Sequence, residues 1–348
     1  MSTLWTLADA LSLWVSVGVA AGAILVALAV DRWAGEPPLK FHPVVWMGNY
    51  LGWVGRWVQA RTRQTSDSIP DFKAFWLAAL VWSGGAAICL IVTWWIQQGA
   101  LAGFATLGVV PGGLGAAVVL GVLLKPLLAW AMLHSEVQAV EQALDPAQGG
   151  SLAAGRTRLS WLVSRDVNAL SESQVRESAI ESLAENLNDS VVAPLFWFVL
   201  LGLPGAALYR FANTADAMWG YPGVYNGKNW LWAGKWAARV DDVLSWLPAR
   251  LTALLLAAVS GGLNLKRLRD EAHCTPSPNS GWPMAAMALS LGVCLQKPRV
   301  YALNSTGRAP ESAHTHQALS LASKVVLSLV FASGATLIFI AIGYFLWS

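Results

Sequence analysis

The sequence predicts an all-α, polytopic integral membrane protein with at least four transmembrane helices. Of its 348 residues, 55% are hydrophobic and 12% are charged, and the mean hydropathy is +0.49. Such a composition lies outside the range of soluble globular domains. Four apolar runs are long enough to cross a bilayer as helices, and Lys125 is the one charged residue in them. These runs are residues 11–30, 75–96, 114–132 and 325–347.

The distribution of basic residues predicts which side of the bilayer each connection occupies. Lys and Arg fall between residues 32 and 73, at Lys125, and between residues 156 and 324, whereas residues 1–31 and 97–113 carry none. The positive-inside rule therefore places both termini outside and the regions 31–73 and 134–324 in the cytoplasm. We expect one membrane-embedded domain over residues 1–348, with these two regions forming its catalytic part. The net charge of +3 is too small to indicate nucleic-acid binding.

Two further apolar segments, residues 191–209 and 243–259, are ambiguous. Each is short and contains proline together with glycine or arginine. Two complete crossings would put the polar stretch 213–239, with its basic residues, on the outside. We therefore expect re-entrant or broken helices that are covered by protein, although two full crossings would leave the termini on the same sides.

Four carboxylates at four-residue spacing, Glu177, Glu181, Glu185 and Asp189, precede the first of these segments. On a helix they form one stripe, and each like-charged pair costs a few tenths of a kcal/mol. We expect a cation to offset that cost. A solvated acidic face is the alternative interpretation, and Glu177, furthest from the membrane, is the member expected to be solvated. Apolar residues at helical spacing beside the stripe predict an amphipathic cytoplasmic helix.

Hard oxygen ligands elsewhere extend this hypothesis to a Mg²⁺-phosphate site. Mg²⁺ uses one or two carboxylates together with phosphate oxygens. The sequence contains no GxxxxGK[ST] loop, so phosphates must be held by the metal and by scattered Arg and Lys. The predicted metal ligands are Glu185, Asp189, Asp216, Asp241 and Asp242.

Several polar residues have both a binding and a structural interpretation. Arg239 and Arg250 can reach phosphate oxygens or form ion pairs with aspartates. Arg165 and Asp166 can contact phosphate or form a local salt bridge, and Asn213 can orient a ligand or cap a helix. Ser277 and Asn279 precede a helix that Pro283 is suited to begin, where exposed N–H groups favour an anion, but ordinary capping explains the same pattern.

Six strings in order carry a resemblance to a known family. They are DRWAGEPP, HPVVWMGNYLG, RTRLSWLVSRDVNAL, ESLAENLNDSVVAPLFWFVLLGLPGAALYRFANTADAMWGY, AGKWAARVDDVLSWLPARLTA and SPNSGWPMAAMA. Together they resemble the adenosylcobinamide-phosphate synthase (CobD/CbiB) family of cobalamin biosynthesis. The sequence differs from the usual family pattern at two places. It has Asp189-Ser190 where the family often has Asp-Gly, and Gly35-Glu36-Pro37 where the family often has Gly-Asp-Pro. Each change keeps the carboxylate.

The resemblance implies a carbon–nitrogen ligase of the bacterial inner membrane. With ATP and Mg²⁺ such an enzyme joins a corrinoid, adenosylcobyric acid, to (R)-1-amino-2-propanol phosphate or a related aminoalcohol. The resemblance also favours activation of the carboxylate as an acyl phosphate rather than as an acyl adenylate. Other membrane enzymes of late cobalamin assembly are candidate partners. The predicted catalytic residues are Glu181, Glu185, Asp189, Asp241 and Asp242. The predicted substrate- and phosphate-binding residues are Arg165, Asp166, Asn186, Asn213, Arg239, Arg250, Ser277 and Asn279.

Two other functions compete with the ligase. A non-catalytic membrane sensor of the same superfamily would not require so many charged groups next to lipid. A cation-coupled transporter would be expected to carry carboxylates within its spans, whereas Lys125 is the one ionisable residue in the four firm spans.

Overall fold

The computed structural model describes residues 7–62 and 70–347, and this part of the chain is almost entirely helical. Residues 63–69, which belong to the predicted cytoplasmic region 31–73, lie outside the described residues. Six described stretches are long and apolar enough to cross a membrane, so the prediction of an all-α polytopic membrane protein is confirmed. The helices are α1 (Leu7–Ala34), α2 (Pro43–Gln59), α3 (Phe72–Ala105), α4 (Val109–Leu124), α5 (Trp130–Leu144), α6 (Leu152–Leu159), α7 (Glu172–Leu187), α8 (Ala193–Trp219), α9 (Lys235–Val259), α10 (Leu265–Ala272), α11 (Gly281–Leu291) and α12 (Ser312–Trp347).

The chain divides into two compact units, each made of separate stretches. Unit 1 combines Met1–Leu128, Pro194–Asp241 and Leu329–Ser348, and unit 2 combines Ala129–Ala193 and Asp242–Ser328. Helices α9 and α12 therefore contribute residues to both. Each unit has one short hairpin: β1 (Val224–Tyr225) with β2 (Lys228–Asn229), and β3 (Leu295–Lys297) with β4 (Tyr301–Leu303).

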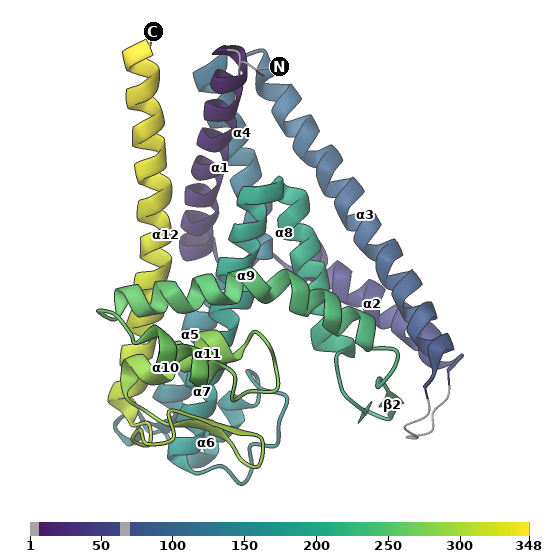
Figure 1. The fold of residues 1–348 in the computed structure, drawn as a ribbon, viewed down its shortest axis with the longest axis vertical. Coiled ribbons are helices and arrows are strands. Elements are labelled where there is room, and N and C mark those ends of the chain that lie inside the picture. The colour runs from purple at the N-terminus through teal and green to yellow at the C-terminus, as the bar shows by residue number, and fades with distance from the viewer. Residues whose placement is uncertain (1–6, 63–69, 348) are drawn as a thin grey trace. The chain divides into compact units, whose positions relative to one another are not determined.

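In unit 1, α1 and α4 lie side by side (Figure 1) because small residues line their contact. A Cβ on Gly121 would lie 2.6 Å from the carbonyl oxygen of Ala23, so only glycine permits this approach. Helix α4 stops at Leu124, within the span predicted at residues 114–132, and the candidate membrane-crossing stretch Val109–Leu144 includes that span. Pro126 lacks an N–H group to continue the helix, and a 3₁₀ turn, Lys125–Leu127, follows.

A buried charge cluster lies at this turn. The ammonium group of Lys125, which is 2% exposed, lies 3.3 Å from Asp31 and 2.6 Å from Glu36. The Nε2 atom of His42 lies 3.2 Å from Glu36, while its Nδ1 accepts a hydrogen bond from the N–H of Val44 and caps α2. We refer to Asp31, Glu36, His42 and Lys125 as the Lys125 cluster.

Helix α8 is broken, as the sequence predicted for residues 191–209. Gly202 has φ 69° and ψ −157°, and the chain reverses there, so that the two arms of α8 run side by side in Figure 1. A Cβ on Gly205 would lie 2.4 Å from the carbonyl oxygen of Trp197 on the other arm. The side chain of Gln97 on α3 accepts the N–H of Leu203 at 2.7 Å. A backbone donor freed by the break is thus satisfied by protein, as a membrane environment requires.

The second ambiguous segment, residues 243–259, differs from its prediction. Helix α9 is continuous from Lys235 to Val259 and passes through Pro248 without a break. The hydroxyl of Thr252 donates to the carbonyl oxygen of Pro248 at 2.9 Å, within the turn that follows the proline. The expectation of a broken helix is therefore wrong for this segment.

Unit 2 is built around α7, which contacts α5, α6, α11 and β3. The guanidinium group of Arg176 on α7 lies 2.9 Å from Glu141 on α5 and 2.7 Å from Glu172 one turn earlier. A capping box between Ser171 and Gln174 begins the helix. The acidic stripe therefore lies at the centre of this unit.

Candidate functional site

Two of the four acids of the stripe, Glu177 and Glu181, are buried, whereas Glu185 and Asp189 are partly exposed. Glu177 is 4% exposed and Glu181 is 5% exposed, and residues on every face of the helix are covered. The prediction of an amphipathic, half-solvated helix is therefore wrong, and so is the expectation that Glu177 is solvated. Helices α5, α6 and α11 and strand β3 cover α7. The periodicity of α7 alone does not indicate that these segments pack against it.

Glu181 is the best-connected carboxylate of the stripe. One of its oxygens lies 3.0 Å from a guanidinium nitrogen of Arg165, and the other accepts the hydroxyl of Tyr301 at 2.9 Å. Arg165 also donates to the hydroxyl of Ser178, one turn earlier on α7, and interacts electrostatically with Glu177. The predicted local salt bridge to Asp166 does not form, because Arg165 pairs with α7 instead.

Tyr301 brings the β3–β4 hairpin to the stripe. Burial, and then the carboxylate of Glu181, raise the pKa of the Tyr301 hydroxyl far above its ordinary value of 10.0, and Glu185 adds to this effect. The phenol therefore stays protonated and donates to Glu181 across the physiological pH range. Lys297 on β3 also interacts electrostatically with Glu181. Carboxylates, an arginine and a tyrosine hydroxyl thus meet beside α7.

The last acid of the stripe, Asp189, lies in a π-helical segment, Asn188–Val192, that follows α7 directly. Its Oδ1 accepts the side-chain amide of Asn188 at 2.8 Å, and the amide oxygen of Asn188 accepts the hydroxyl of Thr252 on α9 at 3.0 Å. The carbonyl oxygen of Ser190 accepts the N–H of Ala129 at 3.1 Å. Single π-helical turns within helices are frequent at functional sites, and this one sets the direction of Asp189.

Arg250 and Asn279 join α9 to the segment before α11. Arg250 donates to the side-chain oxygen of Asn279 at 2.7 Å and to the carbonyl oxygen of Pro278 at 3.1 Å, and it stacks on Trp246 and Trp282. The amide of Asn279 donates to the carbonyl oxygen of Asp242 at 2.8 Å. Among the described residues Arg250 forms no ion pair with an aspartate, so that alternative is not observed.

Other predicted residues have local partners. The hydroxyl of Ser277 accepts the N–H groups of Asn279 and Ser280 in the turn before α11, whose N-cap residue, Ser280, makes no side-chain capping hydrogen bond. Asp166 accepts the N–H and the amide of Asn168, and Asn186 donates to the carbonyl oxygen of Ser182.

The remaining predicted residues are divided between the two units. Asn213 and Asp216 lie inside the second arm of α8, so neither caps a helix, and the side chain of Asn213 lies 3.5 Å from Arg210. Arg239 and Asp241 lie in the first part of α9. Glu185, Asp189 and Asp242 belong to unit 2. Within residues 7–62 and 70–347 no three Asp, Glu, His or Cys side chains gather as a protein-only metal site would require. The five-residue metal set stays a prediction.

Two residues of this site were not predicted from the sequence. Tyr301 and Thr252 contact Glu181 and Asn188 from segments that follow them by 120 and 64 positions. A tyrosine in a short hairpin and a threonine inside a helix have no spacing that indicates such a role. Their contacts follow from the fold alone.

Comparison with known proteins gives a single family. The family model described as CobD/Cbib protein matches residues 24–327. A probable cobalamin biosynthesis protein CobD from Methanothermobacter thermautotrophicus is 35% identical over 91% of this chain and 98% of its own length. One of the same name from Thermococcus kodakarensis is 38% identical over 88% and 92%, and the cobalamin biosynthesis protein CobD of Chromobacterium violaceum is 39% identical over 78% and 79%. No solved structure matches.

Proposed function

The chain belongs to the CobD/CbiB family of cobalamin biosynthesis, and from this premise we propose that it is an ATP- and Mg²⁺-dependent amide ligase. Its substrates would be adenosylcobyric acid and (R)-1-amino-2-propanol phosphate or a related aminoalcohol, and its product adenosylcobinamide phosphate. The proposal locates the enzyme in the bacterial inner membrane, with regions 31–73 and 134–324 facing the cytoplasm. The acidic stripe with Arg165 and Tyr301 is the observation that carries it.

Amide formation from a carboxylate and an amine needs an activated acyl group, and therefore a nucleotide and a metal. The donors in unit 2 suit Mg²⁺, because carboxylate oxygens are the hard ligands it prefers and it takes only one or two of them beside phosphate oxygens. One or two of Glu185, Asp189 and Asp242 would hold the ion together with phosphate oxygens. When bound, Mg²⁺ would neutralise charge on the phosphates and position them.

The chain's own residues would prepare this site. Glu181 and Ser178 hold the guanidinium of Arg165 in place, where it can also reach a phosphate oxygen. Tyr301 fixes the orientation of Glu181 by donating to it. The amide of Asn279 holds the backbone at Asp242, and the amide of Asn188 orients Asp189. Each proposed ligand-binding group is thus positioned by a second polar side chain or by the helix that carries it.

An assay of the purified protein tests the proposal. The full-length chain in detergent would be incubated with ATP, Mg²⁺, adenosylcobyric acid and aminopropanol phosphate, and products would be identified by mass spectrometry. We expect the amide product, with stoichiometric loss of ATP. Well-folded protein that forms no amide product would exclude the ligase. Product formation without ATP would exclude the proposed activation.

A further inference from the structure

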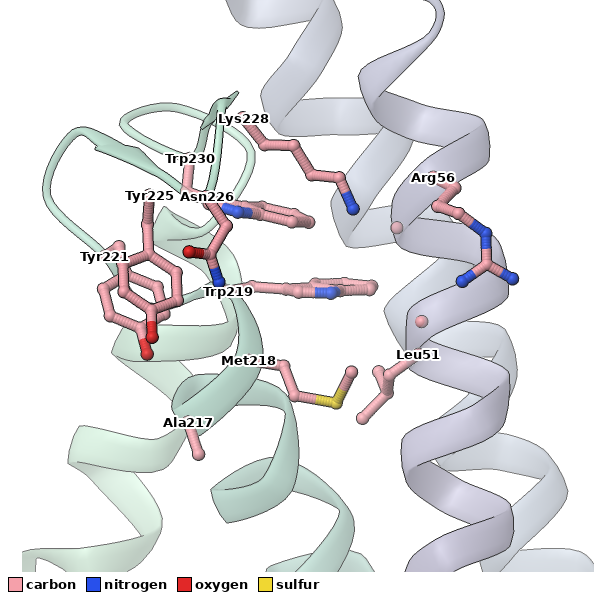
Figure 2. A pocket seen from close by; sticks show the side chains of 12 residues that line it. Leu51, Arg56, Ala217, Met218, Trp219, Tyr221, Tyr225, Asn226, Lys228 and Trp230 are labelled. Carbon is pink, nitrogen blue, oxygen red and sulfur yellow. The ribbon is translucent and has the colours of Figure 1, made fainter. Parts of the chain in front are cut away.

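Unit 1 contains a pocket that the proposed function does not use. It lies where α2 meets the end of α8 and the β1–β2 hairpin, and its volume is about 270 Å³ (Figure 2). Leu51 and Arg56 line it from α2, Met218 and Trp219 from α8, and Lys228 and Trp230 from the hairpin and the residues after it. All of these residues belong to one compact unit.

The aromatic wall of the pocket is built before any ligand arrives. The rings of Trp219 and Trp230 stack with centroids 5.6 Å apart and an interplanar angle of 12°, and Trp219 is 1% exposed. A Cβ on Gly55 would lie 2.9 Å from the indole nitrogen of Trp219, so glycine is what lets α2 approach the stack. The β1–β2 turn uses Asn226 and Gly227, both with positive φ, as a tight hairpin requires.

The charge of the pocket is positive. Arg56 and Lys228 line it, and none of its lining residues is acidic. In Figure 2, Lys228 extends from the hairpin toward α2, while the guanidinium of Arg56 lies alongside α2 and is turned away from Lys228. Within residues 7–62 and 70–347, neither of these side chains takes part in a hydrogen bond or ion pair. By contrast, the nearby Arg61 stacks on Trp57 and donates to its carbonyl oxygen.

We propose that this pocket binds a phosphate group. Two cations that line one pocket with no acidic lining residue favour an anion, and a guanidinium and an ammonium can each donate to the oxygens of a phosphate. The volume is near the lower end of ligand pockets, about 300 Å³, which suits one phosphate-bearing head rather than a whole corrinoid. Met218, which is partly exposed, provides an apolar surface for the group that carries the phosphate.

Two sources share this chemistry: a soluble phosphate ester and the head of an anionic phospholipid. Trp53 and Trp57 on α2 are exposed, and exposed tryptophans are typical of the membrane interface, where lipid heads are available. The inference does not depend on the ligase activity.

Binding to the full-length protein, purified in zwitterionic detergent, tests the inference and separates the sources. Inorganic phosphate would be titrated by calorimetry at constant ionic strength. Dioctanoyl phosphatidylglycerol would be counted by native mass spectrometry, with dioctanoyl phosphatidylcholine as the reference without net charge. The variant is Arg56→Gln with Lys228→Gln, and Arg61→Gln is the matched control. Thermal unfolding of every variant would confirm that it is folded.

We expect the double variant to weaken binding of at least one probe by about tenfold or more, because it removes two charge-assisted contacts. Arg61→Gln should bind as the unmodified chain does, and Lys228→Arg should retain binding. Loss for phosphatidylglycerol alone would identify the lipid, and loss for inorganic phosphate would identify a soluble ester. Equal binding by the double variant and the unmodified chain, or no binding of either probe by the unmodified chain, would overturn the inference.

Discussion

The stripe on α7 and the Lys125 cluster both bury carboxylates, but they differ in where those carboxylates come from. In the Lys125 cluster, Lys125 pairs with Asp31 at the end of the apolar part of α1 and with Glu36 in the following turn, and Glu36 in turn contacts His42, which caps α2. On α7 the acids Glu177 and Glu181 come from a single helix, one turn apart.

The charges of the Lys125 cluster therefore connect separate elements, whereas the acids of α7 repel one another within a single helix. Lys125 and its partners connect elements, so each charge has a structural reason. Acids one turn apart on the same buried helix repel one another and join nothing to each other. Arg165 and Lys297, the cations that interact with Glu181, come from outside the helix. The proposed binding role would account for the stripe, whereas the ion pairs of the Lys125 cluster connect elements of the fold.

Replacing Lys125 should have the largest effect on stability. Lys125→Met leaves Asp31, which is 1% exposed, without its buried cation, and breaking a buried pair in this way costs about 3–5 kcal/mol. We expect a large drop in the free energy of unfolding measured in mixed micelles. Lys40→Met, at an exposed lysine of the same region, is the control. Adding Asp31→Asn to Lys125→Met should restore part of the loss, and unchanged stability of Lys125→Met would show that the cluster does not hold unit 1 together.

Glu185→Gln should separate function from stability. Turnover in the ligase assay should fall by at least about a hundredfold, since even groups behind a metal ligand cost 10–100-fold when lost. The free energy of unfolding should change by less than about 1 kcal/mol, because a charge is removed from a repelling set. Glu172→Gln, at the start of the same helix, should leave turnover unchanged. Near-normal turnover of Glu185→Gln would remove this residue from the proposed site.

Tyr301→Phe tests how much the hydrogen bond from the Tyr301 hydroxyl to Glu181 contributes to stability. Losing a hydrogen bond to a charged group should cost about 1.5–3 kcal/mol of stability. Because the pKa of Tyr301 is raised in the folded protein, this stabilisation is complete below pH 10, the ordinary tyrosine value, and is lost only as the pH rises through the raised pKa. The difference between variant and unmodified chain should therefore be constant from neutral pH to about pH 10. A difference that changes within that range would contradict the assignment, and Tyr225→Phe serves as the control.

The smallest effect is expected for His42→Ala. It removes the side-chain cap of α2 and should cost about 1 kcal/mol. Unfolding of this variant should be compared with that of Phe41→Ala, which changes an exposed neighbour. A loss as large as that of Lys125→Met would mean that His42, rather than Lys125, holds the cluster.

Membrane spans and the break in α8 were predictable because single features determine them. A long uncharged run requires burial in lipid, and Gly202 next to Pro204 prevents a regular helix. The continuity of α9 through Pro248 was not predicted correctly. Pro126 ends a helix whereas Pro248 does not, and this depends on what the neighbouring backbone contacts rather than on the proline itself.

The candidate site was predictable only in part. Spacing along α7 predicted the stripe, but its burial depends on α5, α6, α11 and β3, which lie far from it in sequence. The pairing of Arg165 with Glu181 and the contact of Tyr301 depend on how loops fold back on α7. The sequence pattern at Ser277 is compatible with both helix capping and anion binding, because the two roles require the same residue types.

Metal binding by the stripe is the most direct test of the account. Mn²⁺, used in place of Mg²⁺, would be titrated into the full-length protein with ATP and followed by electron paramagnetic resonance, for the unmodified chain, Glu185→Gln, Asp189→Asn and the control Glu172→Gln. We predict a protein-bound Mn²⁺ signal in the unmodified chain and in Glu172→Gln that is weakened in the other two. Equal Mn²⁺ binding by all four folded proteins would contradict the proposal that α7 and its π-helical extension hold the metal.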